Sequence, residues 1–402
     1  MYFVLLFGVL SLFADFAYEG ARSITGPFLA SLGASGFVVG SVTGFGEFLG
    51  YAWRLASGRW ADRSRLYWPI TLAGYLVQMV SVPLLAIARI WPAAAVLICL
   101  ERTGRATRNP PRDVMLARAG ERMGRGWAFG VNEALDQLGA TVGPLAVAGL
   151  LAWRHDFTLA FAALAAPALV TLLLLLAARM KFPYAGRINR EPEASQEPET
   201  SQARHRAWVA DYPPAYWWYC AGVGLAGFGF ADYSLIAYHF TRAHTVPGPW
   251  IPIFYAAAMG AGGLGSLLAG RLFDRVGLII LVPITIIVAA YAPLAFLGGF
   301  LLALAGALLW GIGVGVHESV MQAAVAHMIP SERLGSAYGL FGAVFGVAWF
   351  GGSAALGALY DRSVTAAVEL AVVSQLVAVG PLLIAARALR ARYSDHPPPS
   401  AL

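Results

Sequence analysis

The chain has 402 residues, of which 58% are hydrophobic and 12% are charged, and its mean hydropathy is +0.65. A water-soluble protein carries about twice that charged fraction, so a soluble enzyme, a disordered scaffold and a nucleic-acid-binding protein are not expected. The net charge of +6 does not change this conclusion, because positive residues also collect in the cytoplasmic loops of membrane proteins.

Apolar stretches of about 20 residues are long enough to cross a bilayer as helices. In chain order, the hydropathy predicts spans at 3–31, 36–57, 67–88, 92–109, 126–151, 158–180, 215–242, 250–270, 278–298, 299–328, 334–358 and 364–386. The first is interpreted as a membrane helix and not as a signal peptide, because it lacks a basic n-region and an A-x-A-like cleavage site. The predicted fold is an all-α integral membrane protein with 12 transmembrane helices.

A polar segment rich in Pro, Glu, Ser and Gln separates the sixth and seventh spans. Such a composition cannot bury a core, so the predicted organisation is a six-helix bundle at 1–182, a flexible linker at 183–212, and a second six-helix bundle with a short tail at 213–402. If the N-terminus is cytoplasmic, 22 of the 28 Lys and Arg residues fall on the cytoplasmic side and four on the outer side. This bias predicts a multi-pass protein of the inner (cytoplasmic) membrane with both termini inside.

Three short motifs occur once in each half, in the same order and at offsets of 211 to 217 residues. They are GRWADR at 58–63 and GRLFDR at 270–275, Glu-Arg-Met-Gly at 121–124 and Glu-Arg-Leu-Gly at 332–335, and Phe-Ala-Asp at 13–15 and 230–232. Two parallel repeats of six spans are a transporter architecture, in which the substrate cavity lies between the halves.

The segment at 58–65, expected as the loop after the second span, resembles the G-x-x-x-D-R-x-x-R signature of the major facilitator superfamily. The resemblance implies two pseudo-symmetric six-helix bundles and secondary transport by alternating access. The glycine lets two helices approach closely, and the aspartate can face a helix N-terminus and nearby arginines. We therefore expect a conformational latch formed by Gly58, Asp62, Arg63, Arg65, Gly270, Asp274 and Arg275.

The fifth span is similar to the antiporter motif G-x8-G-x3-G-P-x2-G of the superfamily's drug and metabolite exporters. The matching residues are Gly130, Gly139, Gly143 and Pro144, whereas Val147 replaces the last glycine. Pro144 permits a kink in the helix. The resemblance favours export. It does not identify the cargo, because Leu100 stands where those exporters usually carry an arginine.

Ionisable residues at membrane depth are costly unless they pair or face water, so each is a functional candidate. The candidates on the first and seventh spans are Asp15, Tyr18, Glu19, Arg22, Asp232 and Tyr233. Asp15, Glu19 and Arg22 share one helix face, because they are spaced at i, i+4 and i+7. In the superfamily these spans line the central cavity, so Asp15 and Asp232 could bind a cation or carry protons; the alternative is that Glu19 and Arg22 neutralise each other.

Further charged residues lie on the second, fifth and tenth spans. Glu47 and Arg54 share a face of the second span, where a structural role for Arg54 is favoured. Glu133 and Asp136 could pair with arginines 102 and 105 of the fourth span, as a gate, a proton relay or a structural contact. The pair His317 and Glu318 could titrate near physiological pH or form part of a satisfied core. The histidines are too dispersed to predict a metal site.

The sequence lacks a G-x-S-x-G nucleophile elbow, an H-E-x-x-H zinc pair and a Walker A loop, so we expect neither an enzyme nor a cofactor. The hypothesis is a proton-coupled exporter (antiporter) of a small organic molecule, with Asp15, Glu19 or Asp232 as the main proton carriers. Proton symport, facilitated diffusion and, more remotely, a non-transporting receptor or scaffold are the alternatives. The expected partners are the lipid bilayer, the substrate and protons, with no nucleic acid and a monomeric state. Carboxylates outnumber Arg22 in this proposed cavity, which favours a neutral or cationic cargo.

Overall fold

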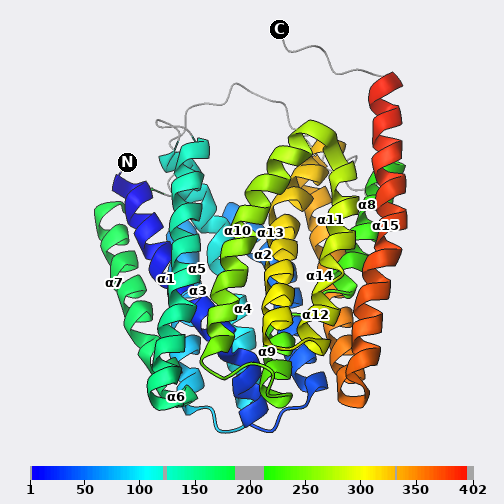
Figure 1. Ribbon diagram of the computed structural model, residues 1–402. Coiled ribbons are helices and arrows are strands. Elements are labelled where there is room, and N and C mark those ends of the chain that lie inside the picture. Colours follow the sequence, from blue (N-terminus) through cyan, green and yellow to red (C-terminus); the bar gives the residue numbers. More distant parts are fainter. Residues whose placement is uncertain (1, 121–124, 186–211, 331–332, 396–402) are drawn as a thin grey trace.

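The computed structural model describes residues 2–120, 125–185, 212–330 and 333–395, and all regular elements in these ranges are helical. Most helices run side by side along the length of the molecule (Figure 1). In chain order they are α1 (Tyr2–Ser31), α2 (Gly36–Ser64), α3 (Tyr67–Leu84), η1 (Leu85–Ile87), α4 (Trp91–Ala119), α5 (Arg125–Arg154), α6 (Phe157–Ala163), α7 (Ala165–Lys181), α8 (Pro214–Phe228), α9 (Tyr233–Arg242), α10 (Trp250–Val276), η2 (Gly277–Ile280), α11 (Leu281–Val288), α12 (Tyr291–Leu297), α13 (Phe300–Met328), α14 (Leu334–Arg362) and α15 (Val364–Asp395).

These helices form the twelve predicted membrane spans. Within the described ranges, nine stretches are long and apolar enough to cross a bilayer, and one of them, 250–297, is long enough for two spans. The other two spans are α2 and α4, whose apolar character is diluted by the charged side chains of the cavity described below. The sixth, seventh and ninth spans are each divided into two helices. The prediction of an all-α, 12-helix fold is confirmed.

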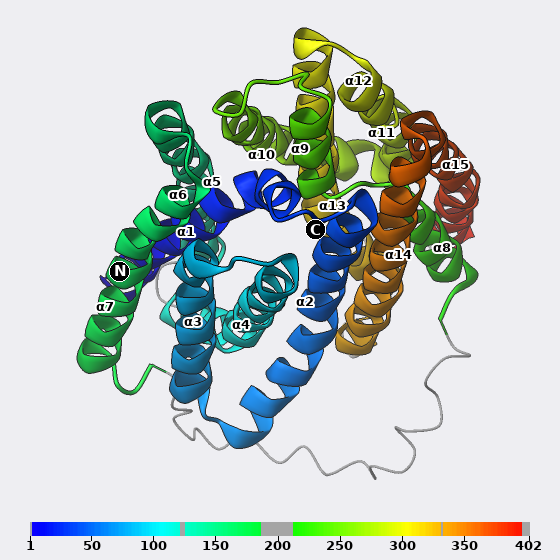
Figure 2. The ribbon, with the colours of Figure 1, turned by 90° about the horizontal axis from the view of Figure 1, so that it is seen from below.

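The two halves of the chain, α1–α7 and α8–α15, lie against each other (Figure 2). Across the interface, α2 packs on α14, α5 packs on α10, and α1 packs on α9. The first two pairings are equivalent under the internal repeat, because the second and eighth spans correspond, as do the fifth and eleventh. The domain boundaries remain a prediction, since 186–211 lies outside the described residues.

Glycines set how closely the helices approach inside the N-terminal half. A Cβ atom at Gly139 or Gly143 of α5 would overlap the backbone of Leu12 or Phe16 on α1. Gly130, in contrast, has open space where a Cβ would stand. Two glycines of the antiporter-like motif are therefore packing positions, and the third is not.

The halves are closed on each other at the end of the molecule opposite to the termini (Figure 1). There, Gly40 of α2 lies against the backbone of Ser353 on α14, where a Cβ would overlap the Ser353 carbonyl oxygen. The Asp361 carboxylate accepts hydrogen bonds from the first backbone N–H groups of α2, at 2.7 Å from Gly36 and 2.8 Å from Phe37. Close packing of small residues and a helix-capping carboxylate thus stabilise the contact between the halves at this end.

The signature segments are helical, and the prediction of loops is wrong. Residues 58–63 form the last turns of α2, which ends at Ser64, and 270–275 form the last turns of α10, which ends at Val276. Arg65 ends α2 in the left-handed conformation, with φ of 55°. Hydropathy ended both spans too early because charged residues can continue a helix beyond the apolar part of a membrane.

Candidate functional site

A cavity of about 630 Å³ lies between the halves. Helix α2 begins at the closed end with Gly36, and its cavity-lining residues, from Glu47 to Arg54, lie around its middle. The lining residues of α4 and α5 extend further from the closed end, to Asp113 near the end of α4 and Phe129 near the start of α5. The cavity therefore occupies the middle of the molecule and the part nearer the termini. Its volume is in the range of sites for small organic ligands.

The two walls of this cavity differ in chemistry. Among the described lining residues, the N-terminal half supplies every Asp, Glu and Arg side chain, namely Asp15, Glu19, Glu47, Asp113, Glu133, Asp136, Arg22, Arg54, Arg102, Arg105, Arg108 and Arg112. The C-terminal half supplies Met259, Val314, His317, Met321, Phe341, Phe345 and Trp349. Among these described residues, acids and arginines are equal in number, so the expectation that carboxylates outnumber arginines is wrong. It considered the first and seventh spans and left out α4.

Four arginines of α4 face the cavity because of their spacing. Arg102, Arg105, Arg108 and Arg112 follow one another at intervals of three or four residues, which places them on one helix face. This regular spacing was the signal in the sequence that could have predicted a basic wall.

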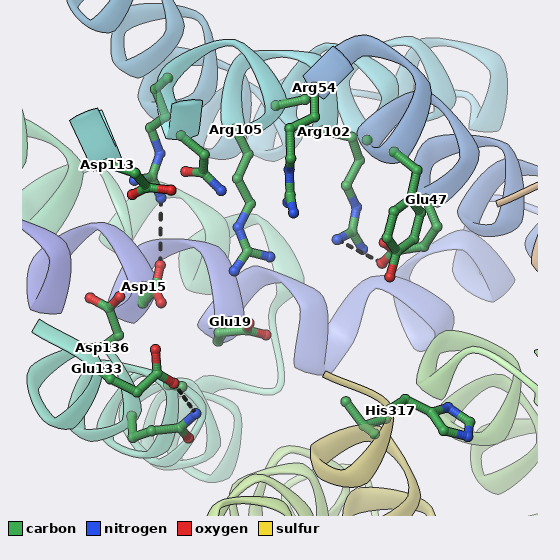
Figure 3. Close-up of a pocket in the computed structure, with 18 of the residues that line it drawn as sticks. Asp15, Glu19, Glu47, Arg54, Arg102, Arg105, Asp113, Glu133, Asp136 and His317 are labelled. Carbon is green, nitrogen blue, oxygen red and sulfur yellow. Dashed lines mark hydrogen bonds and ion pairs between the residues drawn. The ribbon is translucent and has the colours of Figure 1, made fainter. Parts of the chain in front are cut away.

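A chain of ion pairs crosses the interface between the halves. The Arg22 guanidinium lies 3.1 Å from Glu47 and 3.1 Å from Asp232. Arg102 lies 2.9 Å from the same Glu47 carboxylate (Figure 3). Asp232 is fully buried and also accepts a hydrogen bond from the backbone of Ser234 at 2.9 Å, capping α9. These contacts join α1, α2 and α4 to the break in the seventh span.

The predicted acids of α1 have separate partners. Asp15 pairs with Arg108 at 3.6 Å. Glu19 accepts a hydrogen bond of 2.5 Å from the Tyr255 hydroxyl on α10, in the other half. No nitrogen of Arg22 lies within 4 Å of the Glu19 carboxylate among the described side chains, so the two do not neutralise each other directly.

The two predicted tyrosines have different positions. Tyr18 accepts a hydrogen bond from Arg102, and the guanidinium carbons of Arg102 and Arg105 lie 5.0 and 4.3 Å from the centre of its ring. Tyr233 is buried and donates to the Ile251 carbonyl at 2.7 Å. Tyr18 thus supports the arginine wall, whereas Tyr233 belongs to the core and does not line the cavity.

The acids of α5 face the cavity without an arginine partner. Glu133 accepts a hydrogen bond from Gln137 at 3.1 Å, and Asp136 accepts one from Asn132 at 2.8 Å, both on α5 itself. In the part of the chain that the structure describes, no arginine nitrogen lies within 4 Å of either carboxylate. The expected pairing with the fourth-span arginines is not formed.

His317 lies on the wall of the C-terminal half. Its ring centre lies 5.0 Å from that of Phe230 and 6.0 Å from that of Phe345. The Nδ1 atom is buried, and no described residue hydrogen-bonds to it. The side chain of Glu318 lies outside the described residues, so this half of the predicted pair is not placed.

The residues of the expected latch lie at the end of the molecule that carries the termini, opposite to the closed end. Gly58 of α2 faces Pro110 of α4, and a Cβ there would lie 3.6 Å from the proline ring. Asp62 is exposed, and Tyr67 donates to it a long hydrogen bond of 3.5 Å. Arg63, Arg65, Asp274 and Arg275 are also exposed, and Gly270 has open space around it. Within the described ranges none of these charged groups forms an ion pair.

Sequence reasoning missed several cavity residues. Arg108, Arg112, Tyr255, Phe345 and Trp349 contribute to the site or its contacts. The aromatic residues gave no signal, because a buried tyrosine or tryptophan in an apolar span is usually part of the core. No group of three or more His, Cys, Asp or Glu residues is arranged to hold a metal ion in the ranges described.

Comparison with known proteins agrees with this architecture. The sequence profile of the Major Facilitator Superfamily matches residues 7–353. The chain belongs to this superfamily. An uncharacterized protein of Mycobacterium tuberculosis is 41% identical over 379 residues, covering 94% of this chain and 91% of the relative. An uncharacterized transporter of the superfamily from Methanocaldococcus jannaschii is 29% identical over 141 residues, 35% of each chain.

Solved transporter structures share the fold. The peptide transporter POT in complex with sulfate has a TM-score of 0.77 at 16% identity, covering 96% of this chain and 95% of the transporter. The nucleoside transporter NupG has a TM-score of 0.68 at 14% identity, covering 98% and 99%. A bacterial homologue of the human lysosomal transporter Spinster, inward-facing and unoccupied, has a TM-score of 0.68 at 16% identity, covering 99% and 98%. The protein is therefore a multi-pass secondary transporter of the superfamily, in a lipid bilayer, and its substrate is a small molecule.

Proposed function

We propose that this protein is a proton-coupled exporter of a small organic molecule in the inner membrane, with both termini in the cytoplasm. The excess of Lys and Arg on the side of the termini supports this orientation. With that topology the cavity faces the cytoplasm, where an exporter loads its cargo. The glycine motif of α5 supports exchange of cargo for protons.

Glu19 is the proposed proton carrier, and the observation that carries this proposal is its hydrogen bond to Tyr255 across the two halves. Asp15 and Asp232 each lie beside an arginine, and such an ion pair lasts only while the carboxylate is ionised. A phenol hydroxyl, in contrast, can donate to an ionised or a protonated carboxyl group. Glu19 can therefore gain and lose a proton while it keeps its partner.

Transport would proceed by opening the end that is closed in this structure. The contacts of Gly40 with Ser353 and of Asp361 with the start of α2 would separate. The signature segments 58–65 and 270–275 would approach their partners at the other end and latch that conformation. Cargo and protons would occupy the cavity alternately, which is the requirement for exchange.

The test uses the purified full-length chain in proteoliposomes that contain a pH-sensitive dye. A pH gradient is imposed, and metabolites and cationic drugs are added one at a time, with protein-free liposomes as the control. Proton movement opposite to a saturable flux of cargo is expected. Movement in the same direction would show symport, and cargo flux without proton movement would show a uniporter. Binding without flux would show a receptor or scaffold, and each of these three results contradicts the proposal.

A further inference from the structure

Arg54 places a positive charge on the cavity, and no described carboxylate forms an ion pair with it. It lines the cavity from α2, and no described carboxylate oxygen lies within 4 Å of its guanidinium. In Figure 3 its side chain lies between those of Arg105 and Arg102 and extends into the cavity. An anionic group of a ligand would find at Arg54 a donor with a planar, bidentate geometry.

Glu133 and Asp136 place negative charge on another side of the same cavity. They accept hydrogen bonds from side-chain amides of α5 itself, Gln137 to Glu133 and Asn132 to Asp136. The Oδ1 atom of Asp136 is buried without a hydrogen-bond partner among the described residues. In Figure 3 these two acids lie away from Arg54, and Glu19 lies between Arg54 and the two acids in this view. The helices that carry the two groups are also separated, since α2 packs on α14 and α5 packs on α10.

These opposite charges do not satisfy each other, because the cavity separates them. A charge that is withdrawn from water without a partner is costly. When the cavity closes around its cargo, the water in it is lost, so the cargo must supply the missing partners. A molecule that carries both an acidic and a basic group would do this at Arg54 and at the two α5 acids together.

The cavity wall formed by the C-terminal half would contact the rest of the cargo. Met259, Val314, Phe341 and Phe345 present an apolar and aromatic surface. In this wall the Nε1 atom of Trp349, a residue that is 6% exposed, has no hydrogen-bond partner among the described residues. The indole N–H can only donate a hydrogen bond. A cargo with an apolar body and one acceptor atom could therefore accept a hydrogen bond from it.

We propose that the cargo is a zwitterionic small molecule with an apolar body. Its acidic group binds Arg54, its amino group binds Glu133 and Asp136, and its body packs on the aromatic wall of the C-terminal half. This inference rests on the transport function proposed above, and it names the class of substrate of the same cavity.

The test measures equilibrium binding to the purified full-length chain, without a membrane or a gradient. The probes are phenylalanine and the dipeptide phenylalanyl-phenylalanine, each with two blocked forms. The N-acetyl form retains only the acid, the C-terminal amide retains only the amine, and glycine is a zwitterion without an apolar body. We expect at least one of the two zwitterions to bind about tenfold or more tightly than both of its blocked forms, as expected for losing one charge-assisted contact. The same zwitterion should also bind about tenfold or more tightly than glycine, because glycine lacks the apolar body that the C-terminal wall would cover.

Variants assign each charge. Arg54→Gln should remove the preference for the zwitterion over its amide, and Glu133→Gln combined with Asp136→Asn should remove the preference over its N-acetyl form. Arg59→Gln, which changes an exposed arginine of the same helix α2, should retain both preferences. The Tm of each variant is also measured, because an unchanged Tm shows that a loss of binding is not caused by a loss of structure.

Three results would overturn the inference. A blocked form could bind as tightly as the zwitterion, the preference could be unchanged in the Arg54 or acid variants, or neither zwitterion could bind. None of these results affects the proton-coupling proposal, because the binding test requires no proton movement. Conversely, a selective zwitterion site in a protein that moves cargo without protons would overturn the coupling proposal and leave the cargo class standing.

Discussion

Arg22 and Asp232 form an ion pair of 3.1 Å that connects the two halves of the transporter. Arg22 lies on α1, and Asp232 caps α9 directly after the break in the seventh span. The repeat partner of Asp232 is Asp15, but that residue pairs with Arg108 inside its own half. The internal repeat therefore preserves the aspartate and not its role.

Asp232→Asn should destabilise the protein in the conformation seen here. Asparagine can still cap α9, since Asn and Asp are equally good N-caps, but it leaves Arg22 with Glu47 alone. Breaking one partner of a buried pair costs about 3–5 kcal/mol, so we expect the apparent Tm of the purified protein to fall by about 5 °C or more. The control is Asp156→Asn, which changes an exposed capping aspartate of α6 that bonds to Thr158. Equal Tm shifts for both variants would contradict a special role for the ion pair.

Glu19→Gln should uncouple cargo movement from protons. Glutamine keeps an oxygen that accepts from Tyr255, but it cannot release a proton, so pH-driven flux should fall at least about tenfold while exchange of cargo for cargo continues. Both fluxes are measured in the proteoliposome assay. Glu369→Gln, at an exposed position on α15, serves as the control and should retain coupling. Full proton movement in Glu19→Gln would exclude Glu19 as the carrier.

Most of the fold could be predicted from the sequence, because each span must be apolar along the length of a bilayer and this requirement is visible in one dimension. The predicted junction near Gly298 and Gly299 is confirmed between α12 and α13. The ends of α2 and α10 were predicted poorly. There the charged signature continues as helix, and hydropathy alone cannot distinguish a polar last turn from a loop.

The candidate site could be predicted only in part. Charges at membrane depth identified Asp15, Glu19, Arg22 and Asp232 as candidates, but their partners depend on helix rotation and on contacts between the halves. Tyr255 binds Glu19 from 236 positions further along the chain. No local pattern in the sequence records a contact between positions so far apart, and it required the three-dimensional arrangement.

Alanine substitutions should separate the two kinds of glycine in the α5 motif. At Gly139 a Cβ would overlap the Leu12 carbonyl oxygen, so Gly139→Ala should lower the apparent Tm and force α5 away from α1. At Gly130 the space is open, and alanine raises helix propensity by about 1 kcal/mol. Gly130→Ala should therefore leave the Tm unchanged or slightly raised. The same loss of stability in both variants would show that close packing on α1 is not the reason for Gly139.

Asp361→Ala should open the end of the molecule that is closed here. It removes two charge-assisted hydrogen bonds to the start of α2, which are worth about 1.5–3 kcal/mol each. The readout is the rate at which a small thiol reagent labels Ser353→Cys, a buried position at the closed end, after both native cysteines are replaced. We expect the labelling rate to rise about tenfold.

The matched control for this experiment is Ser35→Ala. Ser35 also caps α2, through the backbone of Val38 at 3.3 Å, but this contact lies within one half. Its loss should therefore weaken the helix end without opening the interface. If Ser35→Ala raises the labelling rate as much as Asp361→Ala does, fraying of α2 explains the result and Asp361 is not a lock between the halves.

Asp62→Asn should slow transport without weakening the conformation described here. Asp62 is exposed and receives one long hydrogen bond from Tyr67, so its charge contributes little in this state. If it latches the opposite conformation, its loss should reduce turnover about tenfold, the effect of about 1.4 kcal/mol on the conformational equilibrium, while cargo binding and the Tm stay unchanged. Tyr67→Phe removes the contact seen here and should leave turnover normal. Normal turnover in Asp62→Asn would refute the latch, and a lowered Tm in that variant would indicate a structural role for the aspartate in this conformation.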